Sequence, residues 1–462
     1  MLFLFFFVVL IFSLKNRDYV LGIFLSILLL LPSEARIYPI PISCILLLSF
    51  FVIMYSYIYN TDFSLEFYRS VLPPLIYCVY YAFIRILWAF LGTYFSASEI
   101  LTVSFFNVFI FVFAIVAVWK MTVFMLIDKA NKLLLFILFV ISLYGFVAYF
   151  CNRNFYIEIL SVLSPNMERL FSISQRYAEE VRGALSSRLS GVTFSPLQYA
   201  IMLNAYIYLL FYQIFQNKVC RNKLLIVTVL VFLNIFMTGS RGPLVALLLP
   251  VLYFSFLYNN FAGKLKLLFG IAILLLALFV VPGFDSYASF IKSFIFFFDE
   301  TYSQQAQISG SSISGRTMQM EAAYEILTSL DFKTILFGYG DGYHLYYVRE
   351  LAENKAVTGE FEGVLMSATL NYGVLGFIFI EIIPWSFICL LILFYRKRKM
   401  LSKRDSYILY SMFITDVITC FLVGQCARIL YYTIFFYLLK QMIEQNFSFK
   451  LYNLKLIKDV SF

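Results

Sequence analysis

Long apolar runs recur from one end of the chain to the other, and they limit its possible folds more than any other feature. Runs such as Leu224–Met237 and Leu244–Tyr258 are long enough, or nearly so, to cross the hydrocarbon core of a bilayer. In lipid such runs must be helices, because only then does the backbone satisfy its own hydrogen-bonding groups. Hydrophobic residues make up 62% of the 462 residues, more than a soluble domain can bury. The sequence therefore predicts an all-α, polytopic integral membrane protein, with residues 1–462 as a single membrane domain.

The distribution of basic residues predicts how the chain crosses the membrane. The strongest cytoplasmic signal is the basic run Arg396–Lys399. If successive loops alternate between the two sides of the membrane from there, nineteen Lys and Arg residues lie in cytoplasmic segments and three in short outer turns. The path gives about 11–13 transmembrane helices and a cytoplasmic C-terminus. The opening run Met1–Leu14 lacks a basic n-region and a small-residue cleavage site, so we expect it to be a first, retained spanning helix.

Two long polar segments fall on the outside in this topology. They are residues 152–193 and residues 283–361, and the second is expected to contain amphipathic helices. In the stretch Thr317–Leu330, four apolar residues would share one helical face: Met320, Ala323, Tyr324 and Leu327. Loops of this length in a compact membrane domain are usually functional.

Three arginines on the predicted outer side lie among serine and glycine residues. Arg188 precedes a predicted span, Arg241 lies in a tight turn between two spans, and Arg316 follows the Ser-rich stretch Ser309–Gly315. Arginine makes bidentate, permanently charged contacts with phosphate oxygens, so these residues could hold a diphosphate without a metal. The alternative is that Arg188 and Arg316 are ordinary loop cations and that Arg241 caps its turn.

Three further charges lie in or near apolar runs. Arg85 either faces a cavity as a fourth phosphate ligand or extends to the outer interface less than two turns away. Lys120 and Glu381 are interpreted as interfacial residues.

Cysteine and histidine patterns argue against a metal centre. The seven cysteines are scattered singly, and the only histidine is His344, so we expect buried free thiols and neither a metal nor a cofactor. The net charge of +9 sits in short loops that orient the chain, and no nucleic-acid partner is expected.

Four short elements, in this order, resemble the O-antigen polymerase and ligase superfamily. They are Arg-x-x-Gly before a proline (Arg188, Gly191, Pro196), Ser-Arg-Gly (Ser240, Arg241, Gly242), Gly-Arg leading to a glycine turn (Gly315, Arg316, Gly338, Gly340), and a Gly-x-Leu-Gly-like run (Leu370–Gly376). The resemblance assigns Gly191, Gly242, Gly338 and Gly340 to loop and turn support, and it covers roughly residues 186–376.

The resemblance implies an inverting glycosyl transfer at the periplasmic face of a bacterial inner membrane. The donor would be a sugar chain on undecaprenyl diphosphate, with no metal or nucleotide sugar. Polymerases pass the chain to the next lipid-linked repeat unit, whereas ligases pass it to lipid A core. Implied partners are undecaprenyl-diphosphate-linked oligosaccharides, membrane lipids, a chain-length regulator and a flippase.

One departure from the ligase pattern favours a polymerase. Ligases resemble one another in a histidine just ahead of the Gly-x-Leu-Gly element, but here Thr358–Met366 contains none, and His344 lies earlier. The general base is then expected to be Glu362, with Glu360 and His344 as the next candidates. For Glu362 the plain alternative is a solvated carboxylate at a helix start.

Two other functions remain open at this point. A ligase would share the fold, and a flippase for the same lipid-linked saccharide would also need many helices and cations for a diphosphate. A transporter more often shows repeated halves, and the sequence contains no internal repeat at a fixed period.

Overall fold

The computed structural model describes the chain in segments. These are residues 19–30, 36–37, 40–41, 65–91, 111–112, 114–119, 121–122, 124–163, 168–179, 188–216, 221–258, 320–321, 323–325, 328, 331–340, 363–423 and 428–460. Their elements are α2 (Val20–Leu30), β1 (Arg36–Ile37), β2 (Ile40–Pro41), α4 (Leu65–Leu91), α6 (Phe124–Phe150), α7 (Phe155–Leu163), α8 (Glu168–Glu179), α9 (Pro196–Gln216), α10 (Arg221–Met237), α11 (Arg241–Tyr258), α16 (Phe332–Phe337), α18 (Val364–Phe377), η5 (Ile378–Ile382), α19 (Ile383–Lys397), α20 (Lys403–Val423) and α21 (Arg428–Val460).

The protein is an all-α, polytopic membrane protein, as predicted. Four helical stretches of the described residues are long and apolar enough to cross a membrane: Leu126–Phe150, Arg241–Tyr258, Val364–Lys397 and Lys403–Val423. Two shorter apolar helices, Val20–Leu30 and Leu72–Trp88, add to them. The extended backbone in the described part is a two-residue antiparallel pair in which Arg36 lies opposite Pro41. The total number of spans stays a prediction, because several predicted spans fall outside the described residues.

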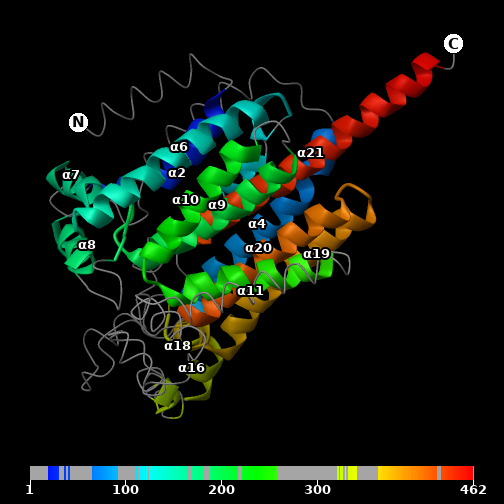
Figure 1. Ribbon diagram of the computed structural model, residues 1–462. Coiled ribbons are helices and arrows are strands. Elements are labelled where there is room, and N and C mark those ends of the chain that lie inside the picture. The colour runs from blue at the N-terminus through cyan, green and yellow to red at the C-terminus, as the bar shows by residue number, and fades with distance from the viewer. Residues whose placement is uncertain are drawn as a thin grey trace.

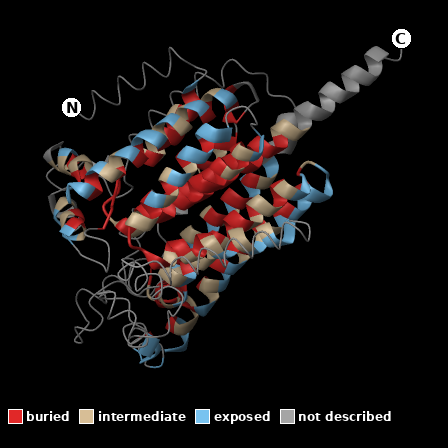
Figure 2. Ribbon diagram, viewed as in Figure 1, coloured by how far each residue is buried: buried red, intermediate tan, exposed pale blue. Residues whose placement is uncertain are grey.

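Helices α9 and α21 form the centre of the bundle. Figure 2 shows both as largely buried, while the surrounding helices α6, α10 and α11 expose one side. In α9, 15 of 21 residues are buried, including Tyr199, Tyr206 and Tyr208. The Tyr206 hydroxyl donates to the Leu25 carbonyl of α2 at 3.2 Å, and the Tyr208 hydroxyl contacts Thr415 of α20 at 2.6 Å. Buried tyrosines thus combine a large apolar area with a satisfied hydroxyl.

The turns between helices alternate between two ends of the bundle. In Figure 1, α7 and α8 lie at the left and α16 at the bottom, whereas the α19–α20 turn lies at the right. Which end faces the cytoplasm stays a prediction.

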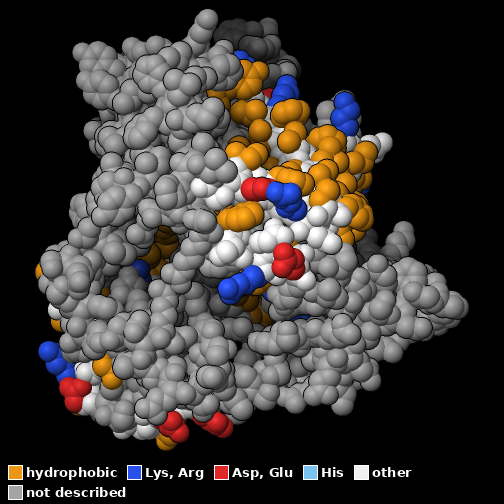
Figure 3. Space-filling model, turned by 90° about the vertical axis from the view of Figure 1, so that its left-hand side faces the viewer, with side chains coloured by type: hydrophobic (Ala, Val, Ile, Leu, Met, Phe, Trp, Pro, Cys, Tyr) orange, Lys and Arg blue, Asp and Glu red, His pale blue; other side chains and the backbone are white. Residues whose placement is uncertain are grey.

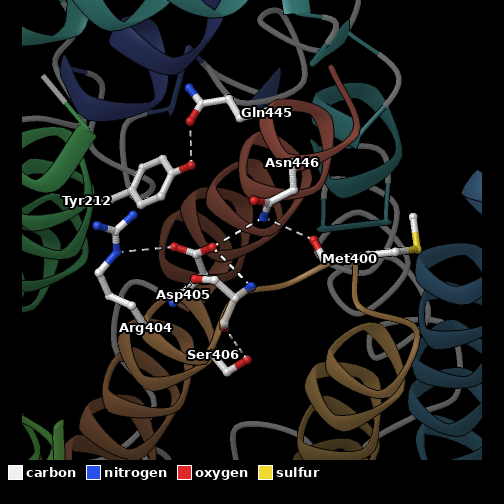
Figure 4. A network of polar contacts seen from close by, with 8 residues as sticks. Tyr212, Met400, Arg404, Asp405, Ser406, Gln445 and Asn446 are labelled. Carbon is white, nitrogen blue, oxygen red and sulfur yellow. Dashed lines mark hydrogen bonds and ion pairs between the residues drawn. The ribbon is translucent and has the colours of Figure 1, made fainter. Parts of the chain in front are cut away.

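A buried polar network closes the end that carries the α19–α20 turn (Figure 4). Asp405 is 1% exposed and accepts hydrogen bonds from the Ser402 N–H at 3.2 Å and from Asn446 Nδ2 at 3.3 Å. Asn446 also donates to the Met400 carbonyl at 3.1 Å, and Ser402 Oγ accepts from the Asp405 N–H at 3.1 Å. Ser402 and Asp405 therefore form a capping box at the start of α20, and Asn446 ties α21 to it.

The interfacial interpretation of Glu381 is wrong. Glu381 lies in the π-helical segment η5, near the middle of the 34-residue apolar stretch Val364–Lys397, and its side chain is 0% exposed. The apolar run alone does not reveal the π-turn, which rotates the following residues relative to a regular helix. Lys120 lies outside the described residues.

The predicted outer segments are partly described. Residues 152–193 contain α7 and α8, and the described cysteines Cys78, Cys151, Cys389 and Cys420 are free thiols. In the second segment residues 320–321, 323–325 and 328 are helical; Ala323 is buried, but Met320 and Tyr324 are 59% and 68% exposed. The extents of the two loops, and of the single domain, stay predictions.

Candidate active site at the ends of α10, α11, α18 and α20

Arg188 is fixed against the turn that carries Arg241. Its side chain is 8% exposed, and its Nε donates to the Thr238 carbonyl at 3.2 Å while a terminal nitrogen donates to Ser240 Oγ at 3.3 Å. The Arg188 N–H donates to the Tyr177 carbonyl at 3.1 Å, and its guanidinium carbon lies 5.0 Å from the Tyr177 ring centre. The two arginine motifs, 53 residues apart in sequence, therefore meet in the fold.

Arg241 is the first residue of α11 and is 5% exposed. The turn before it is closed by the Ser240 N–H, which donates to Thr238 Oγ1 at 3.2 Å. Behind it, Asn204 of α9 donates to the Pro243 carbonyl at 2.9 Å. The first turn of a helix exposes backbone N–H groups and the positive end of the helix dipole. Arg241 thus adds a full positive charge at a place that already favours an anion.

A polar support lies under the Arg188 loop. A Cβ at Gly191 would overlap the Tyr199 ring, so the loop lies directly on that ring. The Tyr199 hydroxyl donates to Asn234 Oδ1 at 3.1 Å, and Asn234 Nδ2 donates to the Ser142 carbonyl at 3.1 Å. Asn234 is 0% exposed and joins α6, α9 and α10. Asparagine within the apolar run Leu224–Met237 is the sequence signal that could have located this support.

The end of α20 links Arg241 to the segment that follows Glu362. A Cβ at Gly242 would lie 2.6 Å from Val423 Cγ2, and a Cβ at Gly363 would lie 2.8 Å from the Phe421 carbonyl oxygen. Both glycines therefore pack against the last turn of α20. Gly363 is the N-cap of α18, so the residue directly before α18 in the sequence is Glu362.

Gly338 and Gly340 pair with the broken part of α18. The Tyr339 N–H donates to the Leu370 carbonyl at 3.0 Å, and the Gly340 N–H donates to the Asn371 carbonyl at 2.8 Å. A Cβ at Gly338 would overlap the backbone of Asn371, and a Cβ at Gly373 would overlap the backbone of Leu336. Gly338 (φ 74°, ψ −177°) and Gly373 (φ 69°, ψ −177°) both occupy a backbone region that is essentially restricted to glycine. The crossing explains why Gly338 and Gly373 must be glycines, whereas the turn-support role of Gly338 and Gly340 in a reaction stays a prediction.

Arg85 lies on α4 beside the same break. It is half-buried and donates a hydrogen bond to the Tyr372 hydroxyl. Its guanidinium carbon is 5.0 Å from the Tyr372 ring centre. Trp88, one turn further along α4, donates from Nε1 to the Tyr372 carbonyl at 2.7 Å, and a Cβ at Gly376 would lie 2.5 Å from that nitrogen. Arg85 therefore contacts the α18 break.

Four predicted site residues lie outside the described residues: Arg316, His344, Glu360 and Glu362. The other predicted site residues fall into two groups. The group around the α10–α11 turn contains Arg188, Arg241, Gly191 and Gly242, and the group around the α18 break contains Arg85, Gly338 and Gly340. Sequence reasoning missed Tyr177, which contacts Arg188 from α8. Its position in a loop helix of ordinary composition carried no signal for that role.

The described part of the first outer segment carries mixed charge. Figure 3 looks at the end that holds α7 and α8, where basic and acidic side chains lie close together beside hydrophobic ones. Arg153 Nε donates to Glu158 at 2.9 Å, and this hydrogen bond and the opposite charge raise the pKa of Arg153. Burial raises the pKa of Tyr156, whose hydroxyl donates to the Leu30 carbonyl at 2.6 Å. The described residues contain no group of three side chains that could hold a metal ion.

The chemistry available to this arrangement follows from its cations. The Arg188 guanidinium contacts the turn that precedes Arg241, and both arginines are buried; Gly242, beside Arg241, and Gly363, the N-cap of α18, both pack against the end of α20. Buried cations of this kind stabilise an anion more strongly than exposed ones, because solvent screens them less. Whether these arginines bind a phosphate group stays a prediction.

Comparison with known proteins agrees with this chemistry. No curated protein matches the chain. Residues 226–380 match a family described as O-antigen ligase, and the matched segment contains Arg241, the Gly338–Gly340 turn and the α18 break. Neither the match nor the geometry separates ligases from polymerases. Over these residues, about a third of the chain, the protein is similar to the O-antigen polymerase and ligase superfamily.

Proposed function

We propose that this protein polymerises undecaprenyl-diphosphate-linked oligosaccharide repeat units at the periplasmic face of a bacterial inner membrane. The contact between Arg188 and Ser240 carries the proposal, because it joins two arginine motifs at the start of a span. Such a pair suits a diphosphate at the membrane surface, where the headgroup of a lipid-linked donor lies. Arg316 is the third proposed ligand, from its motif.

In the proposed reaction the acceptor hydroxyl oxygen attacks the anomeric carbon of the donor sugar. The bond between that carbon and the diphosphate oxygen breaks, and undecaprenyl diphosphate leaves with the electron pair. Arg188, Arg241 and Arg316 stabilise the charge that develops on the leaving group. Glu362, or else Glu360 or His344, accepts the hydroxyl proton. Attack from the face opposite the diphosphate inverts the anomeric configuration.

Two observations bear on the choice between polymerase and ligase. The segment Thr358–Met366, which runs into the first residues of α18, contains no histidine, and this favours the polymerase. The printed description of the matching family is O-antigen ligase, which keeps the ligase as the second candidate. Both enzymes would use the same donor, so the roles of the arginines are the same in either case.

The test is a gel of surface polysaccharide from a deletion strain complemented with wild type, Arg241→Ala or Arg153→Ala. Arg153 is the matched control, because it is 52% exposed and paired with Glu158. We expect the deletion to leave a single repeat unit on lipid A core, and wild type and Arg153→Ala to restore the long ladder. Arg241→Ala should not restore it, although the protein accumulates normally in the membrane.

Other outcomes would overturn parts of the proposal. Loss of every capped form, with full-length chains on undecaprenyl diphosphate, would identify a ligase. Repeat units trapped on the cytoplasmic face would identify a flippase. A wild-type ladder from Arg241→Ala would remove this arginine from the mechanism.

A further inference from the structure

One buried hydroxyl in the loop that carries Arg188 has no hydrogen-bond partner in the described structure. Ser190 is 4% exposed, and its Oγ atom is buried and makes no hydrogen bond. A hydroxyl that leaves water without gaining a new partner destabilises the folded chain. Such a group in a native protein needs an explanation, and one explanation is a ligand that it contacts in the bound state.

Four neighbouring hydroxyl groups, in contrast, all take part in hydrogen bonds. In the loop, Thr193 Oγ1 lies 2.8 and 2.9 Å from two backbone carbonyl oxygens, and Ser195 Oγ accepts a backbone N–H at 3.3 Å. In the turn, Thr238 Oγ1 donates to a carbonyl of α10 at 2.6 Å, and Ser240 Oγ accepts a guanidinium N–H at 3.3 Å. Ser190 Oγ is therefore an exception in a region whose described hydroxyl groups are otherwise paired.

The backbone places the Ser190 side chain on the same side of the loop as that of Arg188. The N–H groups of Arg188 and Leu189 donate to carbonyl groups of two different helices, α8 and α10, as in an extended segment. The Leu189 side chain reaches α6, where its Cδ2 would lie 3.2 Å from a Cβ at Gly145. Successive side chains of an extended segment point to opposite sides. Ser190 and Arg188 thus share the side that faces the α10–α11 turn.

The chemistry around this hydroxyl is that of an anion site. Arg188 contributes a buried guanidinium, and Arg241 begins α11, where backbone N–H groups and the helix dipole add positive charge. A hydrogen bond from a hydroxyl to a charged oxygen is shorter and stronger than one between neutral groups. Because Ser190 Oγ has no described acceptor to give up, it can donate to an entering phosphate oxygen without breaking an existing bond.

We propose that Ser190 Oγ donates a hydrogen bond to a phosphate oxygen of the lipid-linked donor, beside Arg188 and Arg241. This inference rests on the proposed function, which places the donor diphosphate at these arginines. Ser190 then contributes to the state with bound donor and not to the stability of the free protein. Its role is the same in a polymerase and in a ligase, because both would use this donor.

Binding measurements test the proposal without relying on activity. Purified wild type, Ser190→Ala and Ser26→Ala in phosphatidylcholine nanodiscs are titrated with undecaprenyl diphosphate, and bound lipid is measured by native mass spectrometry. Ser26 is the matched control, because it is a 5% exposed serine of α2 whose Oγ donates to the Gly22 carbonyl at 2.7 Å. We expect Ser190→Ala to bind about tenfold more weakly or worse, and Ser26→Ala to bind like wild type. Undecaprenol, which has no phosphate, should bind wild type and Ser190→Ala equally.

Thermal unfolding of the free protein gives a second readout. Ser190→Ala should unfold at the wild-type temperature or above it, because the hydroxyl that it loses makes no hydrogen bond in the free protein. Thr193→Val removes a paired hydroxyl from the same loop and should unfold at a lower temperature. Added undecaprenyl diphosphate should raise the unfolding temperature of wild type more than that of Ser190→Ala.

Arg241→Ala, titrated in the same way, separates failure of this inference from failure of the proposed function. Weaker binding by Arg241→Ala but not by Ser190→Ala would overturn the inference alone. Unchanged binding by both variants would overturn it together with the proposed donor site, and weaker binding by Ser190→Ala alone would keep Ser190 and remove Arg241 from that site. A lower unfolding temperature of free Ser190→Ala, or an equal loss of undecaprenol binding, would show that the hydroxyl supports the loop and would also overturn the inference.

Discussion

Gly338→Ala should destabilise the protein strongly, because the crossing of α16 and α18 leaves no room for a side chain. The Gly338 backbone (φ 74°, ψ −177°) lies in a region that costs a non-glycine residue about 1–3 kcal/mol. The new methyl group would also overlap the backbone of Asn371 and Tyr372, which cannot rotate away, and such overpacking costs about 1–3 kcal/mol more. The expected loss of stability is therefore about 2–6 kcal/mol.

Gly242→Ala is the matched control for this prediction. Its Cβ would lie 2.6 Å from Val423 Cγ2, a side-chain atom of the last residue of α20, so the overlap involves a side chain at a helix end and no backbone atom. Thermal unfolding of both variants in the same detergent and at the same scan rate, followed by intrinsic fluorescence, gives the comparison, since unfolding of such proteins is often irreversible. Gly338→Ala should unfold at a much lower temperature than Gly242→Ala. Equal midpoints, or a Gly338→Ala midpoint equal to that of wild type, would refute the steric reasoning.

Three further predictions concern other parts of the molecule. Tyr177→Leu should weaken donor binding by about 2–30-fold, because the Tyr177 ring no longer stacks on Arg188. Tyr177→Phe keeps the ring and should bind the donor normally. Titration of both variants with the donor checks this prediction. Cys151 is exposed, and in an otherwise cysteine-free chain it should react with an impermeant thiol reagent added from the periplasm. A cysteine that replaces Lys399 should not react. The reverse labelling would overturn the predicted topology. Asn446→Ala removes two donated hydrogen bonds, one to a buried carboxylate, and should cost about 1–3 kcal/mol, seen as a lower unfolding temperature; an unchanged temperature would contradict it.

The class of fold was predictable because the bilayer leaves a chain of apolar runs few alternatives. For the Arg188 and Arg241 motifs, the sequence predicted only that both lie on the same side of the membrane. Their contact depends on how α8 and the residues before α9 fold onto the α10–α11 turn, and no local pattern specifies that packing.

Glu381 and the α18 break illustrate what hydropathy does not reveal. Hydropathy locates a charge along an apolar run, but it does not show that the helix breaks at Gly373 or widens into a π-turn at Ile378–Ile382. Likewise, the sequence shows glycine at positions 338 and 373, but it does not show that the backbones at these positions, about 35 residues apart in sequence, contact each other. Side-chain periodicity carries no information about such close backbone contact.

The pairing of Gly340 with Asn371 and the seating of Gly363 on α20 have an evolutionary consequence. Gly340 and Gly363 are 23 residues apart in sequence, and both are anchored to the same short stretch of structure around α18. The closure entropy of a connection between fixed ends rises only slowly with its length, by about 0.6 kcal/mol for each doubling. Among related chains, a change in the length between these two glycines is therefore expected to leave the frame of α16, α18 and α20 stable. It should act instead on the reaction, because Glu360 and Glu362 lie in this interval.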